Sequence, residues 1–203
     1  MLHPLSFLGC ECDLVTVALV VVLVVVLLLA YMGVFQAVRF VPASIPKCQI
    51  AGFTHIGPYQ NIGSVFEKVE KIQKELKLEH SFFCGLYHDD PSVTAKDKLR
   101  AFAGMAFEKP LDEETLTTLK EKGMRVRHET DEIPCYTTYF PFRNVLSYML
   151  GPMLVYPRIN KKSCPGMDCS CEEEGGIMEI YHDDFIQFMI PRVGGKLFPL
   201  KDL

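Results

Sequence analysis

The sequence predicts an α+β domain built from two β-α-β-β units and preceded by one transmembrane helix. Three observations lead to this prediction. An apolar run without charge lies near the N-terminus, and the tetrapeptide Tyr-His-Asp-Asp occurs twice, at residues 87–90 and 181–184. The same order of strand and helix patterns surrounds both tetrapeptides. A chain of 203 residues is long enough for one such domain plus an appendage.

The apolar run begins at Leu14 and ends at Phe35. As a helix it would be about 33 Å long, which matches a hydrocarbon core of about 30 Å. Its many valines favour a strand in water, but a lone strand in lipid cannot satisfy its backbone groups. A cleaved signal peptide is the alternative, although no Lys or Arg precedes the run and no small-x-small cleavage site follows it. We therefore expect a retained anchor.

The flanks of this run predict its orientation. Residues 1–13 contain Glu11 and Asp13 and no basic residue, so all 21 Lys and Arg residues follow the run. The positive-inside rule places residues 1–13 in a lumen, as a short N-terminus, and residues 36–203 in the cytosol. We expect residues 36–46, with their two prolines, to be a linker and residues 47–200 to be the folded domain.

The first unit is predicted over residues 47–108. A strand over 47–56 is followed by the break at Gly57 and Pro58, and then by a helix over 59–78. The helix is indicated by apolar residues at helical spacing: Ile62, Val65, Phe66, Val69, Ile72 and Leu76. Strands are predicted over 81–87 and 98–107, with residues 88–91 as the turn after the first of them.

A helix over 112–122 and a strand over 124–128 are predicted to bridge the two units. The second unit, counted over 124–191, then repeats the pattern. It has a strand over 135–140, a helix over 143–156, and strands over 177–181 and 185–190. The excess length of this copy falls in the segment that holds Cys164, Cys169 and Cys171, which we interpret as a loop insertion.

The repeated tetrapeptide could be a metal site or a turn that both units share. Asp carboxylates satisfy the backbone of their own turns and need no metal for this. A metal would also require the two turns to converge in space. The turn is therefore the favoured interpretation.

The cysteines and the charge balance exclude some classes of function. Cys48, Cys84 and Cys135 lie in apolar strand patterns and are expected to be buried, reduced thiols. Cys164, Cys169 and Cys171 have C-x4-C-x-C spacing, a weak metal candidate that lacks a fourth ligand, and we expect no cofactor. Beyond the N-terminal acids, the basic and acidic residues nearly balance and form no basic stripe, which argues against direct nucleic-acid binding.

Four short motifs resemble the GyrI-like domain, the small-molecule-binding fold of gyrase-inhibitory proteins and of multidrug-regulator effector domains. They are the H-x-G-x-Y pattern at 55–59, LYHDDP at 86–91, MEIY at 178–181 and FMIP at 188–191. The resemblance implies an antiparallel sheet made of two β-α-β-β copies around a pseudo-two-fold axis, an SHS2-type fold. In that family a glutamate in the MEIY-like strand reaches a cleft between the repeats and attracts cationic, aromatic ligands.

Over residues 14–200 the chain resembles a testis-expressed family of ER-phagy receptors. Residues 97–104 are one of the segments that carry this resemblance. The resemblance implies a single-pass protein of the endoplasmic reticulum membrane that acts as a receptor or adaptor in reticulophagy, and not as an enzyme. It also implies that the protein is located at the autophagosome and the nuclear envelope. The implied partners are a ubiquitin-like autophagy modifier and a valosin-containing-type unfoldase in the repair of protein–DNA crosslinks.

One departure from that family concerns the modifier. The family has an acidic tail with an aromatic-x-x-aliphatic motif, whereas this chain ends at Leu203, soon after the last strand. The pattern occurs here only at 35–38, 53–56 and 59–62, in segments expected to be folded or beside the membrane. A folded segment does not easily add itself as a strand to a partner.

The candidate ligand site centres on Glu179, which aligns with Gly85 in the first unit. Strand alternation places Glu179 and Tyr181 on one face. The alternatives are an edge-strand glutamate facing water and a catalytic acid or base of a membrane-tethered hydrolase. The remaining candidates are Tyr87, His55 and Tyr139, although for His55 the favoured interpretation is a side chain satisfied by the helix N-terminal turn. Haem binding is a third possibility, without any axial-ligand motif.

Overall fold

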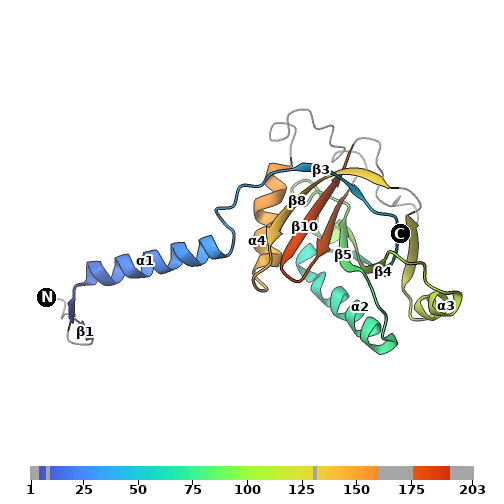
Figure 1. Cartoon of the computed structure of the whole chain (residues 1–203), viewed down its shortest axis with the longest axis horizontal. Helices are drawn as coiled ribbons and strands as arrows, with labels where there is room; N and C mark the ends of the chain where they lie inside the picture. The colour runs from blue at the N-terminus through green and yellow to red at the C-terminus, as the bar shows by residue number, and fades with distance from the viewer. Residues whose placement is uncertain (1–4, 8–9, 130–131, 160–175, 193–203) are drawn as a thin grey trace.

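The computed structural model describes residues 5–7, 10–129, 132–159 and 176–192. Eight of the described strands form one antiparallel sheet in the order β3-β8-β10-β9-β5-β6-β4-β7 (Figure 1). Their bounds are β3 Val41–Ile45, β4 Cys48–Ile56, β5 Phe82–Tyr87, β6 Arg100–Phe107, β7 Arg125–Glu129, β8 Ile133–Pro141, β9 Ile177–Tyr181 and β10 Phe185–Pro191. The predicted α+β class with an antiparallel sheet is confirmed.

The two halves of the chain enter this sheet in the same way. The helices α2 (Gly63–Leu76) and α4 (Ser147–Val155) each follow the first strand of a half. The order is β4-α2-β5-β6 in the first half and β8-α4-β9-β10 in the second, as the alternation of patterns predicts. In the sheet, β8-β10-β9 and β5-β6-β4 are arranged in opposite sense on either side of the central β9–β5 pair. The two halves therefore contribute equivalent strands, β5 and β9, to the centre of the sheet.

The sheet is strongly curled, because β3 and β4 lie near its opposite ends but are separated only by Pro46 and Lys47. Three residue steps span at most about 11 Å, so the two ends of the sheet must approach each other. The inner face of the curl holds one apolar core: Ile45, Cys48, Ile50, Phe82, Cys84, Leu86, Phe102, Ala106, Ile133, Cys135, Met178, Ile180 and Met189. The predicted burial of all three strand cysteines is confirmed.

Two segments differ from the prediction. Residues 36–46 are not only a linker, because β3 pairs with β8 along its whole length. Proline is acceptable at Pro42 because an edge strand can lack one N–H donor. The segment predicted over 124–128 is β7, which pairs with β4 as the other edge of the same sheet and does not merely bridge the halves.

The helices α2 and α4 cover the outer face of the curl, with α3 (Glu113–Glu121) beside α2 (Figure 1). The first predicted helix begins late, since Tyr59–Asn61 form a 3-10 turn before α2. Gly57 has a φ of +131°, which suits glycine and turns the chain from β4 into this segment. The second predicted helix is shortened to α4 and ends in a 3-10 turn, Tyr156–Arg158.

The apolar run forms α1 (Leu14–Tyr31), which projects away from the domain and has no buried residue (Figure 1). The side chain of Asp13 caps it by accepting the N–H of Thr16 at 2.7 Å. The helix is about 27 Å long and ends before Phe35, where the prediction had placed its end. Among the described residues it is the one helix long and apolar enough to cross a membrane, which fits a membrane anchor or a signal sequence. A short hairpin of β1 (Leu5–Phe7) and β2 (Cys10–Cys12) precedes it.

Candidate functional site

Glu179 lies on β9, near the centre of the sheet, and its side chain points to the outer face beneath the helices. Its neighbours Met178 and Ile180 belong to the inner core, as strand alternation predicts. Only 3% of Glu179 is exposed. The interpretation of Glu179 as an edge-strand residue facing water is therefore wrong, because β9 is paired on both sides, with β10 and with β5.

Tyrosine hydroxyls satisfy both carboxylate oxygens of Glu179. Tyr156, just after α4, donates to Oε1, and Tyr181 on β9 donates to Oε2 at 2.8 Å. The hydroxyl of Tyr181 is in turn 2.9 Å from that of Tyr87 on β5. Three elements from both halves of the chain thus contribute to one buried hydrogen-bonded network.

Burial raises the pKa of Glu179 to about 7, even though the hydroxyls of Tyr156 and Tyr181 favour its charged form. No positive side chain of the residues that the structure describes contributes to this pKa. Burial also keeps the phenols protonated, since it raises the pKa of Tyr87, Tyr156 and Tyr181 well above the usual range. The network therefore offers hydrogen-bond donors and one potential negative charge.

A cavity of about 390 Å³ opens next to this network, and we call it the acidic cleft. It lies between α4 and the turn before α2, over β5 and β9. Its lining residues are Tyr59, Gln60, Tyr87, Tyr148, Met149, Pro152, Met153, Tyr156, Glu179 and Tyr181. The rings meet edge to face, with centroids 5.0 Å apart for Tyr59 and Tyr87 and 5.6 Å apart for Tyr148 and Tyr181. The cleft is thus an aromatic box around a single carboxylate.

Gly85 explains why the site contains only one carboxylate. Gly85 and Glu179 are direct partners across the β5–β9 pair, and the equivalent positions of the two halves meet there. A Cβ at Gly85 would lie 2.8 Å from Cε2 of Tyr87 and 3.2 Å from the hydroxyl of Tyr181. Glycine in the first half therefore leaves room for the tyrosine pair that contacts the acid of the second half.

The structure brings together Glu179, Tyr181 and Tyr87 but places the other two predicted residues elsewhere. His55 lies outside the cleft lining, and its Nε2 is 3.1 Å from the carbonyl oxygen of Pro58 at the helix N-terminal turn. Tyr139 is 45% exposed on β8 and packs against Phe185 outside the cleft. The prediction that His55 and Tyr139 contact a ligand therefore does not hold for this cleft.

Sequence reasoning missed Tyr59, Tyr148 and Tyr156. A signal for two of them was present, because Tyr148, Pro152 and Tyr156 are spaced four apart and share one side of the predicted helix. Tyr59 belongs to the H-x-G-x-Y pattern. Its hydroxyl donates to the backbone oxygens of Asp89 and Arg100 at 2.9 and 3.0 Å, which fixes its ring at the mouth of the cleft.

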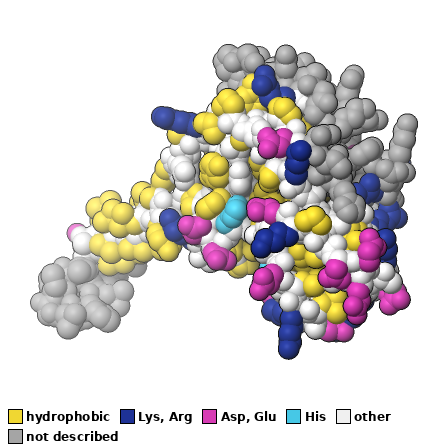
Figure 2. All heavy atoms as spheres, turned by 45° about the vertical axis from the view of Figure 1, so that its right-hand side comes forward, with side chains coloured by type: hydrophobic (Ala, Val, Ile, Leu, Met, Phe, Trp, Pro, Cys, Tyr) yellow, Lys and Arg dark blue, Asp and Glu magenta, His cyan; other side chains and the backbone are white. Residues whose placement is uncertain are grey.

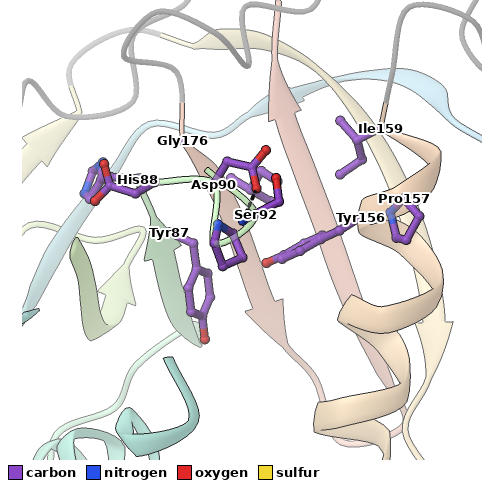
Figure 3. Close-up of a pocket in the computed structure, with 11 residues that line it drawn as sticks. Tyr87, His88, Asp90, Ser92, Tyr156, Pro157, Ile159 and Gly176 are labelled. Carbon is purple, nitrogen blue, oxygen red and sulfur yellow. Dashed lines mark hydrogen bonds between the residues drawn. The ribbon is translucent and has the colours of Figure 1, made fainter. Parts of the chain in front are cut away.

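Tyr87 and Tyr156 also line a second cavity of about 440 Å³, on the side of the turn that follows β5. Figure 3 shows Tyr156 reaching from the end of α4 across the sheet toward Tyr87, while His88 points away from this pair. Asp90 and Ser92 form part of the same wall. The two tyrosines thus stand between this second cavity and the acidic cleft.

The first Tyr-His-Asp-Asp tetrapeptide is a structural turn. Asp89 pairs with Arg100 at 2.6 Å and also accepts the backbone N–H of Arg100 at 2.7 Å. These bonds to Arg100 hold the pKa of Asp89 below its usual range. Asp90 caps the turn by accepting the N–H of Ser92 at 2.7 Å. Burial lowers the pKa of His88 to about 4, so its ring is neutral at neutral pH.

The two tetrapeptides do not converge. The strands β5 and β9 that precede them are antiparallel, with Tyr87 opposite Ile177 and Phe83 opposite Tyr181, so the two turns leave the sheet at opposite ends. The part of the chain that the structure describes contains no group of three metal-ligating side chains. Cys164, Cys169 and Cys171 lie outside the described residues.

The two copies of the tetrapeptide should therefore respond differently to the same substitution. Asp89→Asn should lower the free energy of unfolding by about 2 kcal/mol, because hydrogen bonds to a charged partner contribute about 1.5–3 kcal/mol. Asp183→Asn, at the exposed third position of the second copy, should change it by less than about 0.5 kcal/mol. Urea unfolding of both variants tests this difference, and equal effects would contradict the structural role of the first turn.

Comparison with known proteins decides the family. The family model of the GyrI-like small-molecule-binding domain matches residues 43–186. This chain belongs to the GyrI-like family. No curated protein sequence matches the chain.

Several solved structures are similar to this GyrI-like domain. SAV2435 bound to tetraphenylphosphonium has 9% identity and a TM-score of 0.53, over 76% of this chain and 93% of that one. EcmrR in a complex with DNA has 13% identity and a TM-score of 0.50, over 89% of this chain and 65% of that one. A hydrolase from Listeria innocua has 12% identity and a TM-score of 0.46, over 78% of this chain and 94% of that one.

Proposed function

We propose that this GyrI-like domain binds small lipophilic cations that carry aromatic groups, in the acidic cleft. One observation carries the proposal. Glu179 is a buried carboxylate enclosed by tyrosine rings, and within the described residues it has hydroxyl donors but no cation. A positively charged ligand would supply the missing counter-charge where water is largely excluded.

The shape and chemistry of the cleft fit such a ligand. Its volume of about 390 Å³ lies at the lower end of the usual range for small-molecule sites, about 300–1,000 Å³. Tyrosine rings attract cations through their faces and stack with aromatic groups. The side chains of Met149 and Met153 adapt to ligands of different outline. The solved structure of SAV2435 with tetraphenylphosphonium is a precedent for this ligand class on a similar fold.

The lining favours binding over catalysis. A carboxyl group with a pKa of about 7 is suited to proton transfer. However, the described lining contains no Ser, Cys, Thr, Lys or His beside Glu179. Burial raises the pKa of the phenols of Tyr87, Tyr156 and Tyr181 well above the usual range, so they stay protonated and are poor nucleophiles and bases. Both carboxylate oxygens of Glu179 are also occupied by phenols. We therefore propose a binding protein and not a hydrolase.

Thermal unfolding of the full chain in detergent micelles tests the proposal. Tetraphenylphosphonium should stabilise the domain, by about 2.7 kcal/mol at a hundredfold excess over its dissociation constant. Triphenylphosphine oxide has similar aromatic groups and no net charge, so it should stabilise the domain far less. Equal shifts with both compounds, or a shift with neither, would contradict recognition of a cation in the cleft.

We also propose that α1 is a retained anchor that holds the domain on the cytosolic side of a membrane. Two observations favour this: α1 is an apolar helix with no buried residue that leads directly into the domain, and all Lys and Arg residues follow it in the sequence. Protease treatment of sealed microsomes should degrade residues 40–203. Protection of the domain would place it in the lumen and contradict this orientation.

A role as a reticulophagy adaptor at the endoplasmic reticulum stays a hypothesis that rests on the sequence resemblance and the anchor. Residues 53–56 of the modifier-binding pattern lie in β4 and are paired with β6, and residues 59–61 form a 3-10 turn. Neither segment is open for adding a strand to a partner. Calorimetry of the full chain with the ubiquitin-like autophagy modifier tests the adaptor role. Absence of binding would leave the ligand cleft as the function of this chain.

A further inference from the structure

The outer side of α4 is apolar although it does not face the core. Ser147, Gly151 and Val155 are buried against the sheet. On the other side Met149 (62%) and Met153 (65%) remain exposed, as do Val145 (71%) and Leu146 (54%) directly before the helix. A helix that is apolar on all sides is normally enclosed by protein or by lipid. This side of α4 therefore requires an apolar partner.

The last turns of α1 lie beside this surface. The two helices form a groove of about 350 Å³, lined by Val25, Leu28, Leu29, Met32, Leu146, Met149, Leu150 and Met153. Every lining side chain is apolar. The membrane-anchor candidate and the exposed side of α4 thus form one continuous apolar surface, which we call the α1–α4 groove.

The junction between α1 and the domain is a close contact. Nδ2 of Asn144 is 3.4 Å from the sulfur of Met32, and the guanidinium of Arg143 lies 5.3 Å from the ring centroid of Tyr31. Gly33 has a φ of +81°, and a Cβ there would lie 2.4 Å from Cγ of Pro141. The left-handed conformation of Gly33 and its close packing on Pro141 therefore hold the end of α1 against the segment that leads into α4.

This arrangement places α4 at the depth of a membrane interface. Figure 1 shows α4 lying across the domain end of α1, so an α1 that spans a bilayer puts α4 near the membrane plane. In Figure 2 the apolar surface of α1 runs up to the domain. From Val25 to Met32 α1 rises by about 10 Å, close to the depth of about 5–10 Å at which interfacial helices lie. The exposed rings of Tyr31 and Phe35 suit the same boundary.

We propose that the outer side of α4 lies among lipid acyl chains and that the acidic cleft takes its lipophilic cation from the bilayer. Met149 and Met153 line both the α1–α4 groove and the acidic cleft, so two flexible side chains separate the lipid from Glu179. The ligand class rests on the proposed function of the cleft. The membrane contact of α4 rests on the exposed apolar residues and the position of α1.

The chain contains no tryptophan, so one introduced tryptophan reports on its own surroundings. We would reconstitute full-length Leu146→Trp in vesicles with and without brominated lipids. The bromines should remove at least about half of its emission, because side chains of interfacial helices lie among the acyl chains. The matched control is Val93→Trp, 83% exposed on a loop of the domain, which should lose almost none. Equal quenching of the two reporters would overturn the membrane contact of α4.

A second measurement tests the route of the ligand. Val145 is exposed and lines neither the groove nor the cleft. Val145→Glu should slow the loading of tetraphenylphosphonium from preloaded vesicles several-fold and leave its affinity in detergent unchanged. Unchanged loading would overturn entry from the bilayer. A ligand that fails to bind in detergent would refute the proposed function, while the quenching of Leu146→Trp would still decide the membrane contact.

Discussion

Replacing Glu179 with Gln should weaken the binding of a lipophilic cation about a thousandfold, or about 4 kcal/mol. The substitution keeps the size of the side chain and removes the only acid among the described residues that line the acidic cleft. The bound cation would then be buried without a counter-charge, and losing one partner of a buried charge pair costs about 3–5 kcal/mol. The tyrosine rings alone would retain only weak, general affinity.

Calorimetry with tetraphenylphosphonium measures this loss. Glu108→Gln removes one acid from an exposed position outside the cleft and should leave the affinity unchanged. A Glu179→Gln variant that still binds within about threefold of the natural protein would show that the rings and not the carboxylate recognise the ligand. Thermal unfolding of the variant without ligand establishes that it is folded.

The same interaction predicts how binding depends on pH. In the proposed function the cation pairs with the ionised form of Glu179, whose pKa in the empty cleft is about 7. Protonation therefore competes with the ligand, and the association constant should fall about tenfold for each pH unit below about 7 and level off above it. In Glu179→Gln this dependence should disappear.

Gly52→Ala should lower the free energy of unfolding by about 4 kcal/mol or more. Gly52 on β4 is paired with Gly104 on β6. A Cβ at Gly52 would lie 2.1 Å from the carbonyl oxygen of Ala103 and 2.6 Å from Cα of Gly104. Both are backbone atoms, so the clash can be relieved only if the two strands separate and the curl of the sheet changes.

The matched control is Gly63→Ala at the first residue of α2, where an added Cβ meets nothing within 4 Å. It should be neutral or stabilise the protein by up to about 1 kcal/mol, because alanine favours the helix over glycine. Urea unfolding of both variants provides the comparison. A mild effect of Gly52→Ala, similar to that of Gly63→Ala, would show that the strands yield easily at this point.

The parts of the fold with strong periodicity were predictable from sequence. The spacing of Val69 and Ile72 marks α2, and the alternation in residues 177–181 places Glu179 opposite the inner core. The edge strands were not predictable in the same way. The prolines around β3 indicate a linker, and only the pairing with β8 makes Val41–Ile45 a strand. Tertiary pairing decides such short segments.

The candidate site was predictable only in part, for a similar reason. The repeated tetrapeptide aligns Tyr87 with Tyr181 and Gly85 with Glu179, and those four residues do meet. Nothing in the strand patterns indicates that Tyr156 from the end of α4 would donate to the carboxylate. That contact depends on how a helix packs on the sheet, which one sequence does not reveal.

The curl of the sheet has a consequence for biosynthesis. The strand β3 leaves the ribosome soon after α1, yet its partner β8 lies far along the chain, with Val41 paired to Thr137. Such distant pairing makes folding slow, because a long loop must close first. The strand β3 therefore waits unpaired until most of the protein has been translated. During this interval its unpaired backbone groups can pair with other chains, so β3 is a point of aggregation risk in the partly made protein.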